Sequence, residues 1–262
     1  MKNFLISLLI VLSFFMFPLP SLAEESPLSE LDHIAGRVLE MTRAERYEEA
    51  QALLDFFSNE FSMITAQQNL LSMDELRIVL VSSEQAKQAL HEPSLPSEER
   101  LKNVTSFRLA VDAIASEYEP LWTQMEGRIM SAFSDVRAAA IEGDRKAYQE
   151  RLNNFLSQYS IIQPSIKLDL EVEKVQLLDA KISFIDDERT EVMESVEAMA
   201  ELEGLHNDLE VLFDNVTEDE ADPSLWWVII TTGSIIMGTL SYVGFRKYKA
   251  EKVEKHHKKL KD

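Results

Sequence analysis

Residues 101–118 read LKNVTSFRLAVDAIASEY. Apolar side chains recur in this stretch every three or four residues, at Leu101, Val104, Phe107, Val111, Ile114 and Tyr118. This spacing places them on one face of a helix, because an α-helix makes one turn in 3.6 residues. The same period recurs from Trp122 to Ala140 and from Val196 to Leu212. The sequence therefore predicts an all-α fold built from amphipathic helices.

Turn residues are scarce between residues 24 and 222. Only four glycines occur there, and no Asn-Gly or Asp-Gly pair, which are the usual signals of a β-hairpin. Helix boundaries are predicted at the capping box Ser72-x-x-Glu75, in the Pro-containing loop 92–97, at Gly143-Asp144 and at a turn around Gln163–Ser165.

Three pairs of short segments recur along the chain in the same order. Gly36-Arg37 matches Gly127-Arg128, Phe56-Phe57-Ser58 matches Phe155-Leu156-Ser157, and Glu98-Glu99-Arg100 matches Asp187-Glu188-Arg189. We interpret them as two related halves of about four helices each, residues 29–118 and 120–213, which pack as a helical bundle or a short array. The alternative is convergence, because any two amphipathic helices share their patterning.

An uncharged apolar run near the C-terminus predicts a membrane span. Residues 225–245 read LWWVIITTGSIIMGTLSYVGF, and the tail 246–262 carries eight Lys and Arg against three acids. A helix of that length extends about 31 Å, enough to cross a hydrocarbon core of about 30 Å. Because a basic flank stays on the cytoplasmic side, we expect a transmembrane helix followed by a cytoplasmic tail that contacts anionic lipid.

The N-terminus is typical of a secretory signal peptide, residues 1–23. Lys2 precedes the apolar run Phe4–Phe17, and Ala23 supplies a small residue at the cleavage site. The alternative is an uncleaved signal anchor. With cleavage, the chain is a single-pass type I protein of the cell membrane, with an extracytoplasmic domain 24–213 and an acidic juxtamembrane spacer 214–224.

The predicted span contains two further features. Trp226 and Trp227 are expected to anchor its outer end, and Arg246 and Lys247 its inner end, at the two membrane interfaces. Ser234 and Gly238 form a small-xxx-small pair, which would let two spans pack closely. The sequence therefore allows a weak homo-oligomer.

Charge and composition exclude several functions. Residues 24–222 hold 17 Lys and Arg against 43 Asp and Glu, so this region lacks the basic surface that a nucleic-acid partner requires. The absence of Cys excludes thiol catalysis and Cys-ligated zinc. No sequence signature of an enzyme or of a cofactor-binding loop is present. We therefore expect no catalysis and no cofactor.

One pattern suggests a metal centre. Glu30-x-x-His33 and Glu203-x-x-His206 both place a carboxylate and an imidazole on one helix face. Four-helix di-metal proteins use this spacing, together with one Glu from each of two further helices. Glu is so frequent in this chain that chance is the competing explanation.

The whole layout resembles the YpjB family of sporulation-associated membrane proteins. The likeness rests on the segments Arg46–Ala50 (RYEEA) and Phe56–Ser58, on the span that begins with Trp226-Trp227, and on Arg246–Lys249. It implies a bacterial membrane location and a part in spore formation in relatives of Bacillus, and it brings no catalytic residues.

Together these observations predict an extracytoplasmic domain that binds other membrane or extracytoplasmic proteins during sporulation. Two alternatives remain open. One is a ligand-sensing helical ectodomain, which would need a membrane partner because the tail is too short to form an output domain. The other is the di-metal carboxylate protein.

Overall fold

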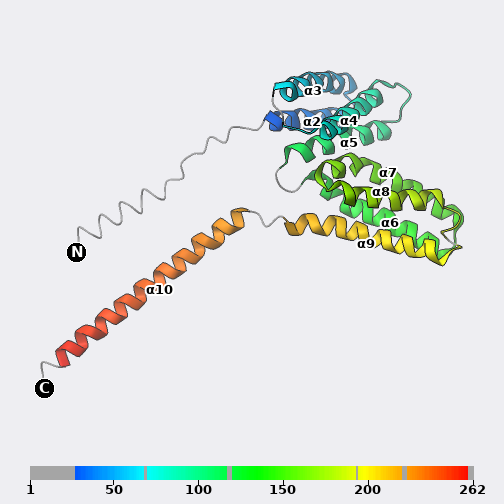
Figure 1. Ribbon diagram of the computed structural model, residues 1–262. Coiled ribbons are helices and arrows are strands. Elements are labelled where there is room, and N and C mark those ends of the chain that lie inside the picture. Colours follow the sequence, from blue (N-terminus) through cyan, green and yellow to red (C-terminus); the bar gives the residue numbers. More distant parts are fainter. Residues whose placement is uncertain (1–26, 68–69, 117–119, 193, 220–222, 259–262) are drawn as a thin grey trace. The chain divides into compact units, whose positions relative to one another are not determined.

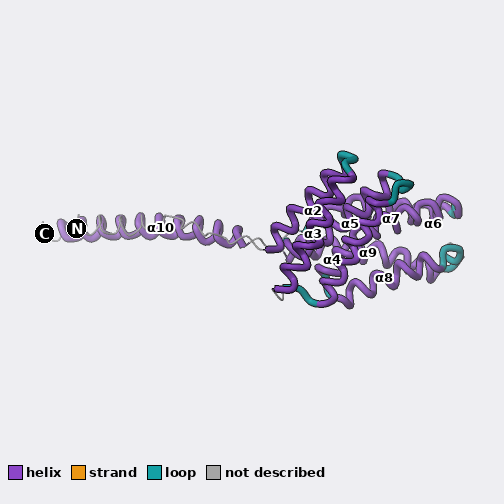
Figure 2. Tube along the Cα trace, turned by 90° about the horizontal axis from the view of Figure 1, so that it is seen from above, coloured by secondary structure: helices purple, strands orange, loops and turns teal. Residues whose placement is uncertain are grey.

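The computed structural model describes residues 27–67, 70–116, 120–192, 194–219 and 223–258 (Figure 1). These residues form helices joined by loops, with no strand among them (Figure 2), and the all-α prediction is confirmed. The chain divides into two units after Ala115. The predicted signal peptide, residues 1–23, lies outside the described residues.

The first unit is a closed bundle. Its helices are α2 (Pro27–Arg43), α3 (Tyr47–Gln67), α4 (Met73–His91) and α5 (Ser97–Ala115). Each helix packs against the next, and α5 returns to pack on α2. Phe107 of α5 meets Phe57 of α3 edge to face, with ring centroids 4.8 Å apart. Both rings are fully buried, and so are Val104 and Val111 of the predicted apolar face, which forms part of the core face of α5. Tyr118, the last position of that period, lies outside the described residues.

The predicted capping box at the start of α4 is confirmed. The Ser72 hydroxyl accepts a hydrogen bond from the Glu75 backbone N–H at 3.2 Å, and a Glu75 carboxylate oxygen accepts one from the Ser72 N–H at 2.6 Å. Two N–H groups that a helix start would otherwise leave unpaired are therefore satisfied. The loop predicted before α5 is also present, since α4 ends at His91 and α5 begins at Ser97.

Ser72→Ala is expected to lower the free energy of unfolding of the first unit by about 1 kcal/mol, because it removes the cap. Urea unfolding followed by circular dichroism measures the change. Ser160→Ala, on the exposed surface of helix α7 (Arg145–Asp169), is the matched control, and equal losses in the two variants would contradict a capping role.

The second unit repeats the same circuit. It contains the short 3₁₀ helix η1 (Leu121–Met125) and the helices α6 (Glu126–Glu142), α7 (Arg145–Asp169), α8 (Val172–Asp187) and α9 (Val196–Asp219). Each of the four α-helices packs on the next, and α9 packs back on α6. Phe133 of α6 and Phe155 of α7 meet in the core at 4.8 Å between ring centroids.

The predicted break at Gly143-Asp144 is confirmed. Gly143 takes the left-handed conformation at φ 71°, which a glycine adopts without the steric cost of a Cβ. Asp144 then caps α7, because its carboxylate accepts a hydrogen bond from the Ala147 N–H at 3.0 Å. One residue thus ends α6 and the next begins α7.

The predicted turn at Gln163–Ser165 is wrong. Helix α7 continues through Pro164 to Asp169. Proline removes one backbone hydrogen bond, to the carbonyl of Ser160, and Ser160 is exposed, so water can take the place of that bond. Ile162 and Ile166, on either side of Pro164, are fully buried. Their packing holds the helix across the proline.

Two helices extend further than the sequence indicated. Helix α9 runs to Asp219, so residues 214–219 of the predicted spacer are helical. No glycine or proline interrupts this segment before Pro223. The C-terminal helix α10 (Pro223–Lys258) likewise continues beyond the predicted span into residues 246–258.

The recurring Arg segments occupy comparable places inside each unit. The Arg100 guanidinium lies over the Tyr47 ring, 4.4 Å from its centroid. Arg189 lies near Tyr148, and its positive charge lowers the pKa of the Tyr148 phenol, against the larger effect of burial, which raises it. In both units, therefore, an Arg in or just after the last loop lies near a Tyr at the start of the second helix. A duplication of the halves stays a prediction.

Candidate functional site

The four candidate metal ligands fall into two pairs on different helices. Glu30 and His33 are exposed on α2, in the first unit. Glu203 and His206 lie one turn apart on α9, in the second unit.

The α9 pair already has protein partners. The Glu203 carboxylate accepts a hydrogen bond from Arg137 Nε at 3.1 Å. The His206 Nε2 atom lies 3.4 Å from a Glu210 carboxylate oxygen, and its ring stacks on Phe133. Across the described residues, no three His, Cys, Asp or Glu side chains gather to hold a metal ion. The di-metal hypothesis therefore gains no geometric support.

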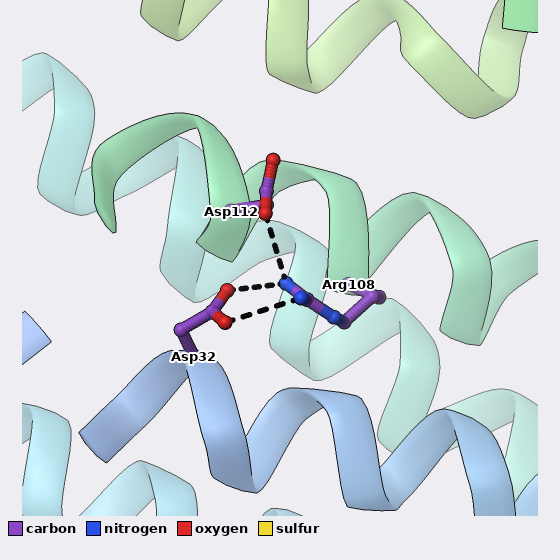
Figure 3. A network of polar contacts seen from close by, with 3 residues as sticks. All are labelled: Asp32, Arg108 and Asp112. Atoms are coloured by element: carbon purple, nitrogen blue, oxygen red, sulfur yellow. Dashed lines mark hydrogen bonds and ion pairs between the residues drawn. The ribbon is translucent and has the colours of Figure 1, made fainter. Parts of the chain in front are cut away.

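A charged cluster joins the first and last helices of the first unit (Figure 3). Arg108 of α5 donates to both carboxylate oxygens of Asp32 on α2, one of them at 3.1 Å, and lies 3.5 Å from Asp112. The three side chains are 13%, 24% and 7% exposed, respectively. Such a two-pronged contact is among the stronger ion pairs in proteins. It fastens α5 to α2, where the bundle closes.

The second unit fastens the corresponding helices in a similar way. Arg137 of α6 makes a two-pronged contact with Glu203 of α9. The positions of the two charges are exchanged: the Arg lies on the first helix of the second unit (α6) but on the last helix of the first unit (α5). Each carboxylate in these closing pairs is neutralised by a guanidinium, so the pairs have a structural role.

Another polar cluster lies between α7 and α8, around Asp179. Its carboxylate accepts hydrogen bonds from Tyr159 Oη at 2.7 Å and Gln163 Nε2 at 2.9 Å, and Lys167 Nζ lies at 3.1 Å. Burial raises the pKa of Asp179, but these three donors together outweigh it and hold the pKa below its ordinary value. Burial and the bond to Asp179 raise the pKa of Tyr159. The carboxylate therefore stays ionised and the phenol protonated at neutral pH.

Tyr148 of α7 is a buried phenol whose hydroxyl finds no hydrogen-bond partner among the described residues. Burial raises the pKa of Tyr148 to about 12. Since the pKa of a tyrosine in an unfolded chain is about 10, the neutral phenol favours the folded state below that pH. This contribution is lost as the pH rises from 10 toward 12.

Tyr148→Phe is therefore expected to leave stability at pH 7 unchanged or slightly higher, because it removes an unpaired polar group. It should also weaken the loss of stability above pH 10. Unfolding free energies measured from pH 7 to pH 11.5 in both proteins test this, and parallel pH profiles would contradict it.

An apolar groove lies between α3 and α4 in the first unit. Its volume is about 490 Å³, and residues on its walls include Phe61, Thr65, Met73, Leu80 and Val81. The Thr65 hydroxyl bonds to the carbonyl of Phe61 within α3 at 2.7 Å, which lowers the polarity of that wall. Met73, Leu80 and Val81 are 79%, 48% and 49% exposed. Grooves of this kind between helices receive the apolar face of another helix.

Helix α8 in the second unit carries a comparable apolar stripe. Leu177 and Phe184 are 59% and 41% exposed, and Ala180 between them is also exposed. The spacing of three and four residues places all three on one face of the helix. The third helix of each unit thus presents apolar side chains to solvent as well as to its core. We refer to these faces as the α4 stripe (Met73, Leu80, Val81) and the α8 stripe (Leu177, Ala180, Phe184).

One segment of the described chain is long and apolar enough to cross a membrane. It covers Val228–Tyr248 of α10, 21 residues with a mean hydropathy of 1.6. Arg246 and Lys247 are exposed near its C-terminal end. Ser234 and Gly238 are exposed one turn apart on its surface. Trp226 and Trp227 belong to α10, but their side chains lie outside the described residues.

The fold and its accessible features define an all-α protein with two four-helix units and an apolar C-terminal helix. Among the described residues, the Asp32–Arg108 pair, the Arg137–Glu203 pair and the Asp179 cluster each join a carboxylate to a cation, and the α4 and α8 stripes expose apolar side chains. The chain belongs to the YpjB family, because the family model described as sporulation protein YpjB (SpoYpjB) matches residues 28–258. It is 34% identical over 232 residues to the YpjB protein of Bacillus subtilis (strain 168), covering 88% of each chain. No solved structure matches it. The predicted resemblance is confirmed, and with it the association with a sporulation family.

Sequence reasoning missed the α4 stripe. Its signal was present in Ile78-Val79-Leu80-Val81, four consecutive apolar residues in a helical segment. A helix that packs on one core cannot bury all of them, because successive residues are 100° apart. Val79 is fully buried, whereas Leu80 and Val81 are about half exposed, as expected for successive residues that point in different directions around a helix.

Proposed function

We propose that this chain is a single-pass membrane protein that takes part in sporulation by binding other proteins through its two helical units. In this account α10 crosses the cell membrane, the units lie on its outer side, and the basic tail contacts anionic lipid on the inner side. The apolar segment Val228–Tyr248 and the exposed cations Arg246 and Lys247 support this orientation.

The α8 stripe is the observation that carries the proposal. Soluble surfaces expose single apolar residues everywhere, but apolar residues grouped on one helix face indicate a contact surface. Phe184 is the largest apolar side chain in either stripe, and aromatic residues often dominate the energy of an interface. A partner that presents an apolar helix would cover this ring.

Binding without catalysis is the role that the polar groups favour. A catalytic acid or base needs a pKa near the working pH and a free position for substrate. The carboxylates of Asp32, Glu203 and Asp179 are each held by a cation. The Asp179–Tyr159 pair is held ionised and protonated, respectively, far from the range of proton exchange at neutral pH.

The test is site-specific photo-crosslinking of the full chain in sporulating cells. A photoreactive amino acid replaces Phe184 or Leu177 in the α8 stripe, and Asn154, exposed on α7, is the matched control position. We expect defined crosslinked products at the stripe positions and none at the control. The same products from all three positions, or none from any, would contradict the proposal.

A further inference from the structure

The α4 stripe contains two charges that cannot neutralise each other within one molecule. Arg77 and Glu84 are exposed on the same face as Leu80 and Val81. They are seven residues apart, about 10 Å along the helix axis, well beyond the reach of an ion pair. Arg77 lines the groove together with Asp74. The Glu84 carboxylate accepts a hydrogen bond from the Gln88 side chain at 2.9 Å and also attracts the ammonium group of Lys87. Arg77 and Glu84 therefore stand on either side of Leu80 and Val81, with the opposite charges of Asp74 and Lys87 beyond them along the helix.

This arrangement is self-complementary. A second α4 can be laid antiparallel across the first, with the two-fold axis between Leu80 and Val81. A residue that lies a given number of positions before the axis then faces the residue that lies the same number of positions after it in the other copy. Arg77 of each copy then faces Glu84 of the other, and Leu80 and Val81 of both copies meet at the centre. A two-fold interface uses the same patch on both molecules, which is the condition that this stripe satisfies.

We propose that the α4 stripe is a self-association surface that takes a second copy of this chain in antiparallel register. The apolar side chains of the second copy fill the groove beside Phe61 and Thr65, and two symmetric Arg77–Glu84 contacts between the copies fix the register and direction. The α8 stripe remains free for a different partner. This pairing is separate from the proposed partner binding, although two copies anchored in one membrane would meet at a raised local concentration.

The absence of cysteine from the chain makes the test direct. Any disulfide must arise from a cysteine introduced on purpose, since the sequence contains none. Val81→Cys places one thiol beside the axis in each copy, within the distance that a disulfide spans. Asn154→Cys, on the exposed surface of α7, is the control. The full chain is expressed in the membrane of its native host and oxidised mildly. The products are then separated by non-reducing gel electrophoresis.

We expect a covalent dimer with Val81→Cys and little with Asn154→Cys. Arg77→Glu added to Val81→Cys places acids opposite each other, and we expect about a fivefold loss of dimer, because like charges across an interface are repulsive. Adding Glu84→Arg as well restores the opposite signs and should restore the dimer. Circular dichroism of each variant confirms that the helices are intact.

Four results would overturn the proposal. The first is no dimer with Val81→Cys in the folded protein. The second is an equal yield of dimer from Asn154→Cys, which indicates random collision. The third is an Arg77→Glu effect that Glu84→Arg does not reverse. A disulfide to a different protein in place of the dimer would assign the groove to that protein and also reject self-association. None of these outcomes depends on the crosslinking at the α8 stripe, so the two proposals fail independently.

Discussion

Phe107→Ala is expected to lower the free energy of unfolding of the first unit by about 3–5 kcal/mol, which is the typical cost of removing a buried Phe side chain from a well-packed core. Phe107 is fully buried and packs edge to face on Phe57 across the bundle. The truncation removes apolar burial, leaves a cavity and removes this aromatic contact. Since domains of this size have only about 5–15 kcal/mol of stability, the variant should be close to unfolding.

Hydrogen exchange measured by mass spectrometry on the full chain is the suitable readout, because it reports the free energy of opening for each helix. Phe56→Ala is the matched control: Phe56 stands beside Phe57 on α3 but is 47% exposed. We expect faster exchange throughout α2–α5 in Phe107→Ala and little change in Phe56→Ala. Loss of protection confined to α5 would show that the four helices do not share one core.

Arg108→Met is expected to cost about 2–4 kcal/mol. Removing one partner of a buried ion pair leaves the other charge uncompensated, and this costs more than the pair itself contributes. The free-energy penalty is smaller than for a fully buried charge, because the Asp32 side chain is 24% exposed and water can still solvate it. In this variant Asp32 loses the guanidinium that pairs with it, and this polar contact between α5 and α2 is removed.

Arg46→Met is the control for the loss of a charged Arg. Arg46, directly before α3, pairs with Glu49 in the first turn of that helix, with more than half of each side chain exposed. Exposed pairs of this kind contribute little, so its unfolding curve should match that of the parent protein. Arg108→Lys, which keeps the charge but loses the two-pronged geometry, should fall between the two. Equal stability of all three variants would show that the Asp32–Arg108–Asp112 cluster does not hold α5 against α2.

The helices and several of their ends were predictable, because they depend on local chemistry. The period of residues 101–118, the Ser72 cap and the Gly143-Asp144 break act within one or two turns of the chain. The error at Pro164 has the opposite origin. Its local preference for a break is overridden by the burial of Ile162 and Ile166, which depends on residues far away in the sequence.

The candidate site was less predictable than the fold. The Glu-x-x-His spacings predicted that two side chains share a helix face, and this holds for α9, where Glu203 and His206 lie one turn apart. The spacing contains no information about Arg137, which binds Glu203 from α6, 66 residues away in sequence. The Asp32–Arg108 pair was invisible for the same reason, since 76 residues separate its members. Contacts between distant helices follow from packing, which a single sequence does not specify.

Membrane topology is decisive for the proposed function, because the proposed interaction requires both units to lie outside a membrane that α10 crosses. The cysteine-free chain allows a clean experiment, in which Asn154→Cys and Lys258→Cys variants are exposed to a membrane-impermeant maleimide on intact protoplasts. We predict labelling of Asn154→Cys in intact protoplasts and of Lys258→Cys only after the membrane is permeabilised. Protection of Asn154→Cys, or labelling of both positions from outside, would contradict the account.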